Sequence, residues 1–302
     1  MEDMITGLCP QCGHTLHIPA ELASFSCMYC GARLTKEQLA AEPPAAQEAD
    51  EDRAAYYDRA VSRLGWCIKN FGGYQKKIMR DVFFEAFETY EPGGAPVMQE
   101  LARGVAPERQ TQLLGRAAAA MLDELEAGWQ KKGDMEDEKI VLAIFFVPMV
   151  RKQQLPISEE FVTILQKQWV ERYPKSPFYL GDYESISGGF RKKFLGLCFI
   201  TTAVCQELGK PDDCEELTAF RAFRDGYLRS QPDGEALIRE YYNIAPGIVT
   251  CINTCSDRHA SYARIREEYL APCYQDLLAG RNESCKARYV RMVRDLEREY
   301  LS

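Results

Sequence analysis

Two short cysteine motifs near the start of the chain constrain its fold more than any other feature. The motifs CPQCG (9–13) and CMYCG (27–31) have the same form, and fourteen residues separate Cys12 from Cys27. Two thiolates separated by two residues can bind one ion from a single tight turn, and the glycine that follows can take the positive φ that such a turn often needs. Each motif therefore predicts a pair of metal ligands.

The two pairs together predict a structural Zn²⁺ site whose ligands are Cys9, Cys12, Cys27 and Cys30. A closed tetrahedral shell of four sulfurs leaves no position for water, so the site is structural and not catalytic. A unit this small cannot build a sufficient core alone, and metal binding then supplies most of its folding free energy. This is the pattern of a zinc ribbon, with a short β-hairpin in the segment 14–26 between the motifs.

Other chemistry at these cysteines stays open. Iron in a rubredoxin-like site also takes four cysteines, and His14 or His17 can replace a cysteine as a ligand. Two disulfides are a further alternative, but residues 1–8 lack the basic start and apolar core of a secretory signal peptide. Twelve cysteines in one chain also fit a reducing compartment, so we expect a cytoplasmic protein.

The charge distribution bears on possible partners. The net charge is −8, and residues 1–60 hold four Lys/Arg against ten Asp/Glu. A ribbon that binds nucleic acid needs basic side chains to displace counterions from phosphates, so we expect another protein as the partner instead. The longest apolar run, 140–150, is about half the length of a membrane span and predicts a buried core helix. The sequence gives no indication of oligomeric state.

Periodicity organises the rest of the chain. Apolar residues recur at three- and four-residue steps from residue 53 onward, and alternating strand patterns are absent from the sequence. The predicted fold is therefore mainly α: a small N-terminal Cys₄ zinc ribbon joined to an all-helical body resembling a bundle. The expected domains are a ribbon (1–40), an acidic Ala/Pro linker (41–52), a helical bundle region (53–180) and a helical C-terminal domain (181–302).

Local signals predict where helices begin and end. Glycine and proline clusters at 72–73, 92–94 and 246–247 predict breaks, and 174–189 is expected to be an ordered loop. Ser158 is the predicted N-cap of a helix that ends at Arg172, and Asn282 that of the last helix. Residues 35–38, TKEQ, have the form of a capping box.

The segments CFITTA (198–203), LTAFRAFRDGYL (217–228) and YYNIAP (241–246) carry a resemblance to a known family. Together they resemble the bacterial CFI-box C-terminal domain, named for a Cys-Phe-Ile-x-Thr-Ala core and continuing with an Arg-x-Phe-Arg-Asp helix. This chain departs from the family at 204–206, where many members have Ala-Tyr-Gly, and inserts residues 209–213. The resemblance covers the last third of the chain and implies a module without a particular activity.

Cys198 is the candidate nucleophile in this segment. A cysteine near a helix N-terminus has a lowered pKa, and Thr201 or Thr202 can cap that helix and leave its amides directed at an anion. A cysteine hydrolase also needs a base, and His259 is the only histidine outside the ribbon. The alternative is a small apolar side chain in a packed core.

Arg221 and Arg224 form the second candidate site. Spaced by three residues on a predicted helix, they share one side and can bind a phosphate or carboxylate. The alternative is an internal salt-bridge network, for which Glu215 and Glu216 are nearby acidic partners.

The sequence thus favours a non-enzymatic zinc-binding interaction or regulatory protein of the bacterial cytosol, with the ribbon as its docking module. The alternative is an enzyme or a small anionic-ligand binder. It would use a pocket around Cys198, Thr201, Thr202, Arg221 and Arg224.

Overall fold

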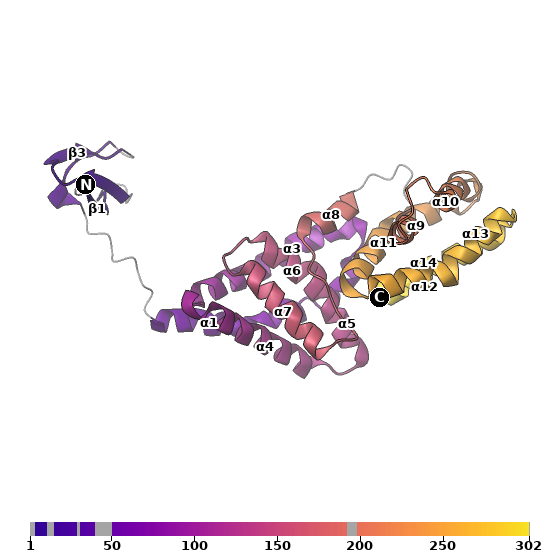
Figure 1. Ribbon diagram of the computed structural model, residues 1–302, viewed down its shortest axis with the longest axis horizontal. Coiled ribbons are helices and arrows are strands. Elements are labelled where there is room, and N and C mark those ends of the chain that lie inside the picture. Colours follow the sequence, from indigo (N-terminus) through magenta and orange to yellow (C-terminus); the bar gives the residue numbers. More distant parts are fainter. Residues whose placement is uncertain (1–3, 11–14, 29–30, 40–49, 192–197, 302) are drawn as a thin grey trace. The chain divides into compact units, whose positions relative to one another are not determined.

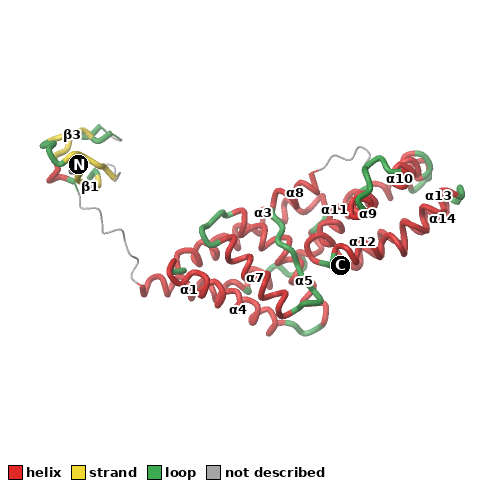
Figure 2. The backbone as a smooth tube through the Cα atoms, in the orientation of Figure 1, coloured by secondary structure: helices red, strands yellow, loops and turns green. Residues whose placement is uncertain are grey.

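The structure is a computed structural model that describes residues 4–10, 15–28, 31–39, 50–191 and 198–301. It is mainly helical, with short antiparallel hairpins near the N-terminus (Figures 1 and 2). The chain divides into two compact units, residues 1–54 and 55–302, each with its own apolar core. Most of the predicted linker, 41–49, lies outside the described residues, whereas residues 50–52 already belong to the first helix.

The N-terminal unit contains two hairpins instead of the single one expected between the motifs. Its strands are β1 (Met4–Leu8), β2 (Thr15–Pro19), β3 (Ser24–Ser26) and β4 (Arg33–Thr35). β1 pairs with β2 and β3 with β4, so each CxxCG motif stands in the sequence between the two strands of one hairpin. The expected position was wrong because a CxxC turn reverses the chain and brings its own flanking strands side by side.

A small cluster of buried side chains holds this unit together. Leu16, Ile18 and Leu34 are buried in it together with two cysteines, and Phe25 packs against it partly buried. The predicted capping box is confirmed in the short helix η1 (Lys36–Gln38), where the Thr35 amide donates to Gln38 Oε1 at 2.9 Å.

The first part of the helical unit surrounds a core rich in aromatic side chains. Its helices are α1 (Asp50–Leu64), α2 (Trp66–Lys69), η2 (Tyr74–Lys77), α3 (Arg80–Gly104), η3 (Pro107–Arg109), α4 (Gln110–Gly128), α5 (Lys132–Val141), η4 (Leu142–Phe146), α6 (Val147–Lys152), α7 (Ser158–Arg172) and α8 (Tyr183–Arg191). α5, η4 and α6 follow one another directly, and the apolar run 140–150 is buried throughout, as predicted. α8 occupies part of the segment 174–189 that was expected to be a loop.

The predicted break at 92–94 is wrong, because α3 continues through it to Gly104. The two glycines let neighbouring side chains pack against the helix: a β-carbon added at Gly94 would lie 2.6 Å from Met149 Cε, and one at Gly93 would lie 3.1 Å from Phe71 Cζ. Burial of the apolar face of α3 offsets the backbone hydrogen bonds that proline removes.

The second part of the helical unit is built on α11. Its helices are α9 (Phe199–Glu207), α10 (Glu215–Asp225), η5 (Leu228–Ser230), α11 (Gly234–Cys255), α12 (Arg258–Ile265), η6 (Arg266–Leu270), α13 (Ala271–Leu278) and α14 (Asn282–Tyr300). α11 contacts α3, α8, α9 and α14, and it continues through Pro246 and Gly247, where the sequence predicted a break.

Two predicted helix caps are also corrected. Ser158 is the first residue of α7, and its hydroxyl accepts from the Leu155 amide at 3.2 Å and donates to Val150 O at 2.7 Å, so it ties α7 to α6 instead of capping α7. Asn282 is the first residue of α14, and the N-cap position is held by Arg281. Among the helices in the described ranges, none is both long and apolar enough to span a bilayer.

Candidate metal centre and apolar pocket

The two cysteines of the metal motifs that the structure describes occupy equivalent places. Cys9 directly follows β1 and Cys27 directly follows β3. Their exposed fractions are 1% and 2%, and both belong to the same small cluster. Cys12 and Cys30 lie outside the described residues. Each of these two cysteines therefore stands as the first ligand of its predicted pair, directly after the first strand of a hairpin.

The second motif forms the tight turn that its sequence predicts. The Gly31 amide donates to Cys27 O at 2.8 Å, and the Cys27 amide donates to Ala32 O at 2.8 Å. Gly31 has a φ of +77°, a conformation that strongly favours glycine. These two hydrogen bonds and the φ of Gly31 are the described features of this turn.

Two histidines between the motifs are the alternative ligands. His14 lies outside the described residues. His17 is exposed on β2, between the buried Leu16 and Ile18, so its side chain projects from the opposite face of the strand to the cluster. Among the described residues, no group of three or more His, Cys, Asp or Glu side chains is placed to hold a metal ion. Zinc and iron both stay predictions.

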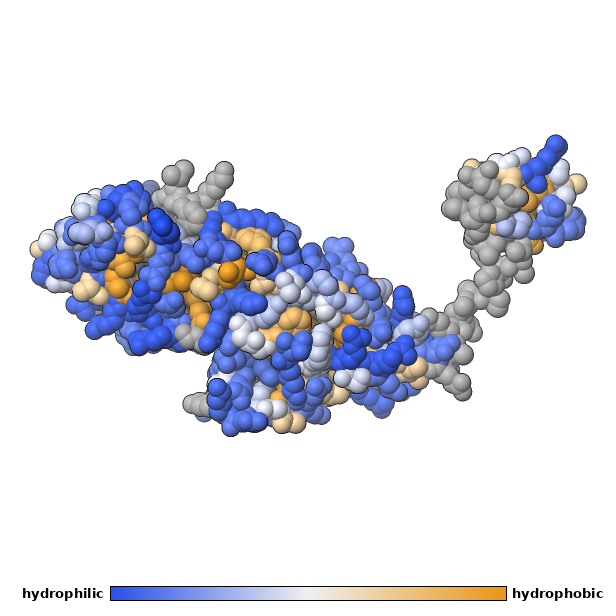
Figure 3. All heavy atoms as spheres, turned by 180° about the vertical axis from the view of Figure 1, so that it is seen from behind, coloured by the Kyte–Doolittle hydropathy of each residue, from blue (hydrophilic) through white to orange (hydrophobic). Residues whose placement is uncertain are grey.

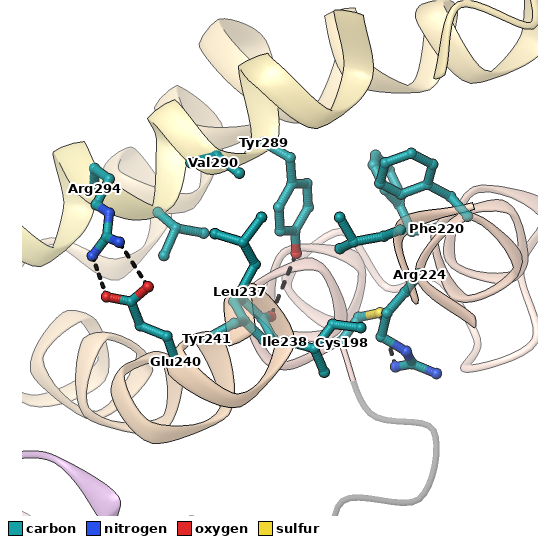
Figure 4. A pocket seen from close by; sticks show the side chains of 13 residues that line it. Cys198, Phe220, Arg224, Leu237, Ile238, Glu240, Tyr241, Tyr289, Val290 and Arg294 are labelled. Atoms are coloured by element: carbon teal, nitrogen blue, oxygen red, sulfur yellow. Dashed lines mark hydrogen bonds and ion pairs between the residues drawn. The ribbon is translucent and has the colours of Figure 1, made fainter. Parts of the chain in front are cut away.

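A second candidate site is an apolar pocket of about 60 Å³ among α10, α11 and α14 (Figure 4). Cys198 and Arg224 lie at one end of it, and an ion pair between Glu240 and Arg294 lies at the other. The remaining lining side chains are apolar or aromatic: Phe220, Phe223, Leu228, Leu237, Ile238, Tyr241, Tyr289, Val290 and Val293. The pocket thus suits a short apolar group.

Cys198 lies next to Arg224 and directly before α9. Arg224 Nη1 lies 3.5 Å from Cys198 Sγ, and the thiol side chain is 4% exposed. Burial raises the pKa of the Cys198 thiol, and the nearby guanidinium groups offset this only in part. At neutral pH the group is a protonated thiol, which is a poor nucleophile.

Both candidate arginines are engaged in ion pairs. Arg224 donates to Asp225 from Nε at 2.8 Å and from Nη2 at 2.6 Å, and these hydrogen bonds lower the pKa of the Asp225 carboxyl. Arg221 donates from Nη2 to Asp212 Oδ1 at 2.8 Å. The partners differ from those the sequence suggested, since Glu216 pairs with Lys210. Arg224 lines the pocket, whereas Arg221 is not among its lining residues.

The expected capping of α9 by Thr201 or Thr202 is wrong, because both threonines lie inside the helix. The hydroxyl of Tyr241 accepts from the Ile200 amide at 3.0 Å and so satisfies one amide of the first turn. Thr201 Oγ1 lies 3.2 Å from the Tyr289 hydroxyl, which donates to the Tyr241 hydroxyl at 3.4 Å. Neither threonine lines the pocket.

His259 does not supply Cys198 with a base. It pairs through Nδ1 with Glu207 at the far end of α9. Glu207 is nine positions after Cys198, which places the two about 13 Å apart along the helix axis. The described residues that line the pocket include no histidine.

The sequence reasoning missed the two tyrosines of this site. Tyr241 belongs to the Tyr-Tyr stretch that the resemblance had singled out, so that resemblance was a usable signal. Tyr289 lies 88 residues after Thr201, its partner, and nothing in the surrounding sequence marks it.

Comparison with known proteins gives no relative: the chain matches no family model, no curated protein and no solved structure. The likeness of residues 198–246 to the CFI-box domain therefore stays a prediction.

Proposed function

We propose that this chain is a non-enzymatic interaction or regulatory protein whose N-terminal unit is a zinc-bound docking module for another protein. Its twelve cysteines fit a reducing compartment such as the bacterial cytoplasm. In this proposal Cys9, Cys12, Cys27 and Cys30 hold a structural metal ion, which fixes the turns between the strands.

One observation supports the docking role most directly. Within the second motif, Cys27 is 2% exposed and the adjacent Met28 is 81% exposed. An exposed, large apolar side chain is poorly placed in water, and methionine adapts readily to the surface of a partner. Leu22, on the turn before β3, is also exposed.

The helical unit supports a role without catalysis. Cys198 is a buried thiol with a raised pKa, and both candidate arginines already bind carboxylates. Figure 3 shows mainly polar side chains on one face of this unit, with apolar patches between them.

Affinity purification with matched baits tests the docking role. Full-length protein, Met28→Ser, Lys36→Gln and a chain lacking residues 1–40 are compared at equal expression. We expect a partner that binds the full chain and Lys36→Gln but is lost from Met28→Ser and from the truncated chain. Lys36 is exposed in the same unit, so it controls for unspecific surface effects. An identical partner set for all four baits rejects the docking role.

The pocket favours a second candidate function, binding of a small amphiphilic anion. Its apolar lining suits a short alkyl chain, and Arg224 at one end can exchange Asp225 for a ligand carboxylate. Calorimetric titration with octanoate tests this function. We expect binding to the full chain and none to Val290→Trp, which fills the pocket. Equal binding heats for the full chain and Val290→Trp exclude anion binding in this pocket.

A further inference from the structure

Two cysteines that neither proposed function uses lie with their sulfur atoms adjacent. Cys205 Sγ lies 3.9 Å from Cys214 Sγ, and the structure contains both as free thiols. Cys205 is in the second half of α9 and is 1% exposed, whereas Cys214 directly precedes α10 and is partly exposed.

The chain between them turns back in a hydrogen-bonded loop. Gly209 has a φ of +66°, the Lys210 amide donates to Cys205 O at 2.9 Å, and the Cys214 amide donates to Pro211 O at 3.1 Å. The loop therefore holds the two thiols together. A disulfide has an S–S distance of about 2.05 Å, so closure needs the sulfurs to approach by roughly 2 Å, which is within reach of small side-chain rotations.

We propose that Cys205 and Cys214 are a redox modification site that closes to an intramolecular disulfide in the presence of a hydroperoxide. The proposal rests on the geometry of this pair and on neither proposed function, because neither function uses the two thiols.

The partly exposed Cys214 reacts first. Its thiol loses a proton, the thiolate attacks one oxygen of hydrogen peroxide, and the O–O bond breaks. The leaving hydroxide takes up that proton, so the products are a sulfenic acid and one water molecule. Cys205 then attacks the sulfenic sulfur, the S–S bond forms, the S–O bond breaks, and the second water leaves. Overall two thiols lose two protons and two electrons, and one hydrogen peroxide is reduced to two waters.

The environment of each thiol supports this order. Burial, together with the neighbouring Cys214, raises the pKa of Cys205 to about 12, so Cys205 carries little thiolate at neutral pH. Its sealed position also keeps peroxide from it until Cys214 has reacted. Cys205 then needs only to reach a sulfur atom that is already next to it.

The disulfide would link two segments of the chain that lead to pocket residues. α9 follows Cys198, and α10 carries Phe223 and Arg224, which line the pocket. A bond between Cys205 and Cys214 fixes α9 to the start of α10. Oxidation therefore restrains α10, the helix that carries Phe223 and Arg224.

A second pair of thiols provides a matched control. Cys273 in α13 and Cys285 in α14 are also close, with Cys273 Sγ 3.9 Å from Cys285 O, but both are fully buried. Peroxide reaches neither sulfur in the folded protein, so this pair should stay reduced under conditions that oxidise the first.

The experiment uses the reduced full-length protein treated with hydrogen peroxide, then blocked with iodoacetamide and digested with a protease that cuts after glutamate. Cleavage after Glu207 separates Cys205 from Cys214. We expect a linked peptide pair, lighter by two hydrogens than its reduced parts and released by dithiothreitol. Cys273→Ser keeps this product, whereas Cys214→Ser and Cys205→Ala lose it.

Two further results would overturn the proposal. One is conversion of Cys214 to sulfinic or sulfonic acid while Cys205 is still alkylated in the wild-type chain, which shows that the pair does not close. The other is oxidation confined to residues 9–30. Dimedone, which traps sulfenic acid, should label Cys214 in Cys205→Ala, and faster labelling of Cys205 in Cys214→Ser contradicts the proposed order.

Discussion

Gly247 of α11 lies directly against the backbone carbonyl of Ile78, the residue that follows η2. A β-carbon added at position 247 would lie 1.8 Å from Ile78 O, far inside van der Waals contact. The close crossing lets α11 pack against α3, and so joins the two parts of the helical unit. The glycine is therefore required for packing and does not end the helix.

Gly247→Ala should lower the free energy of unfolding by about 1–3 kcal/mol, because the added methyl forces two backbone segments apart. Urea unfolding followed by circular dichroism measures the change. Gly188→Ala is the matched control, since no atom lies within 4 Å of an added β-carbon there and helical alanine is favourable. Similar midpoints for both variants would contradict the role of the crossing.

The same position shows where sequence reasoning about the fold fails. Proline removes a helical hydrogen bond and glycine weakens a helix, so Pro246 and Gly247 locally predict a break. In the folded chain α11 buries Ile244, Ala245 and Ile248 around that point, and this packing outweighs the local preference. Periodicity was enough to predict that these segments are helical. Whether a helix continues through a proline or glycine depended on packing against residues distant in the sequence.

The candidate sites divide in the same way. The cysteine motifs carry their own geometry, so the tight turn at Gly31 followed from spacing alone. The neighbourhood of Cys198 instead depends on α10, α11 and α14 meeting around it, and the pairing of Arg221 with Asp212 in place of Glu215 or Glu216 reflects how the loop before α10 folds back. No local pattern encodes such a contact.

Tyr241→Phe should destabilise the protein by about 1–3 kcal/mol. The hydroxyl of Tyr241 accepts from the buried Ile200 amide, and its removal leaves that amide without this acceptor. Tyr289→Phe removes only the longer hydroxyl contacts and should change stability by about 1 kcal/mol.

Thermal unfolding of both variants tests whether Tyr241→Phe is the more destabilising change. Tyr179→Phe, at an exposed position, is the control for loss of a hydroxyl. If Tyr241→Phe unfolds at the same temperature as Tyr179→Phe, the hydroxyl does not stabilise the start of α9.

Asp276→Asn should destabilise the turn between α13 and α14 in a pH-dependent way. Asp276 accepts from Arg281 at 3.0 Å and from Arg288 at 3.4 Å, and these bonds lower the pKa of its carboxyl below 3.8. Because the pKa is lower in the folded state, the stabilisation is fully present above pH 3.8 and is lost as the pH falls through the folded-state value.

The difference in melting temperature between wild type and Asp276→Asn should therefore be largest near pH 7 and decrease below pH 3.8. Melting curves across this range measure it, with the exposed Asp213→Asn as control. A difference that grows as the pH falls would show that Asp276 does not act through its charge.

Removal of the metal should affect the N-terminal unit alone. The cores of residues 1–54 and 55–302 are separate clusters, and five buried side chains of the smaller one, two of them cysteines, are too few to hold it without an ion. A strong chelator should therefore release close to one zinc per chain and abolish hydrogen-exchange protection in β1 to β4. The melting temperature of the helical unit should not change.

Serine variants test which cysteines bind the metal. Cys27→Ser should lower the zinc content of the purified protein and expose the remaining motif thiols to alkylation, since loss of one thiolate opens the tetrahedral shell. Cys67→Ser alters a fully buried thiol of the helical unit and should leave zinc content unchanged. Full zinc retention by Cys27→Ser, or unchanged protection of β1 to β4 after chelation, would show that the N-terminal unit folds without a metal.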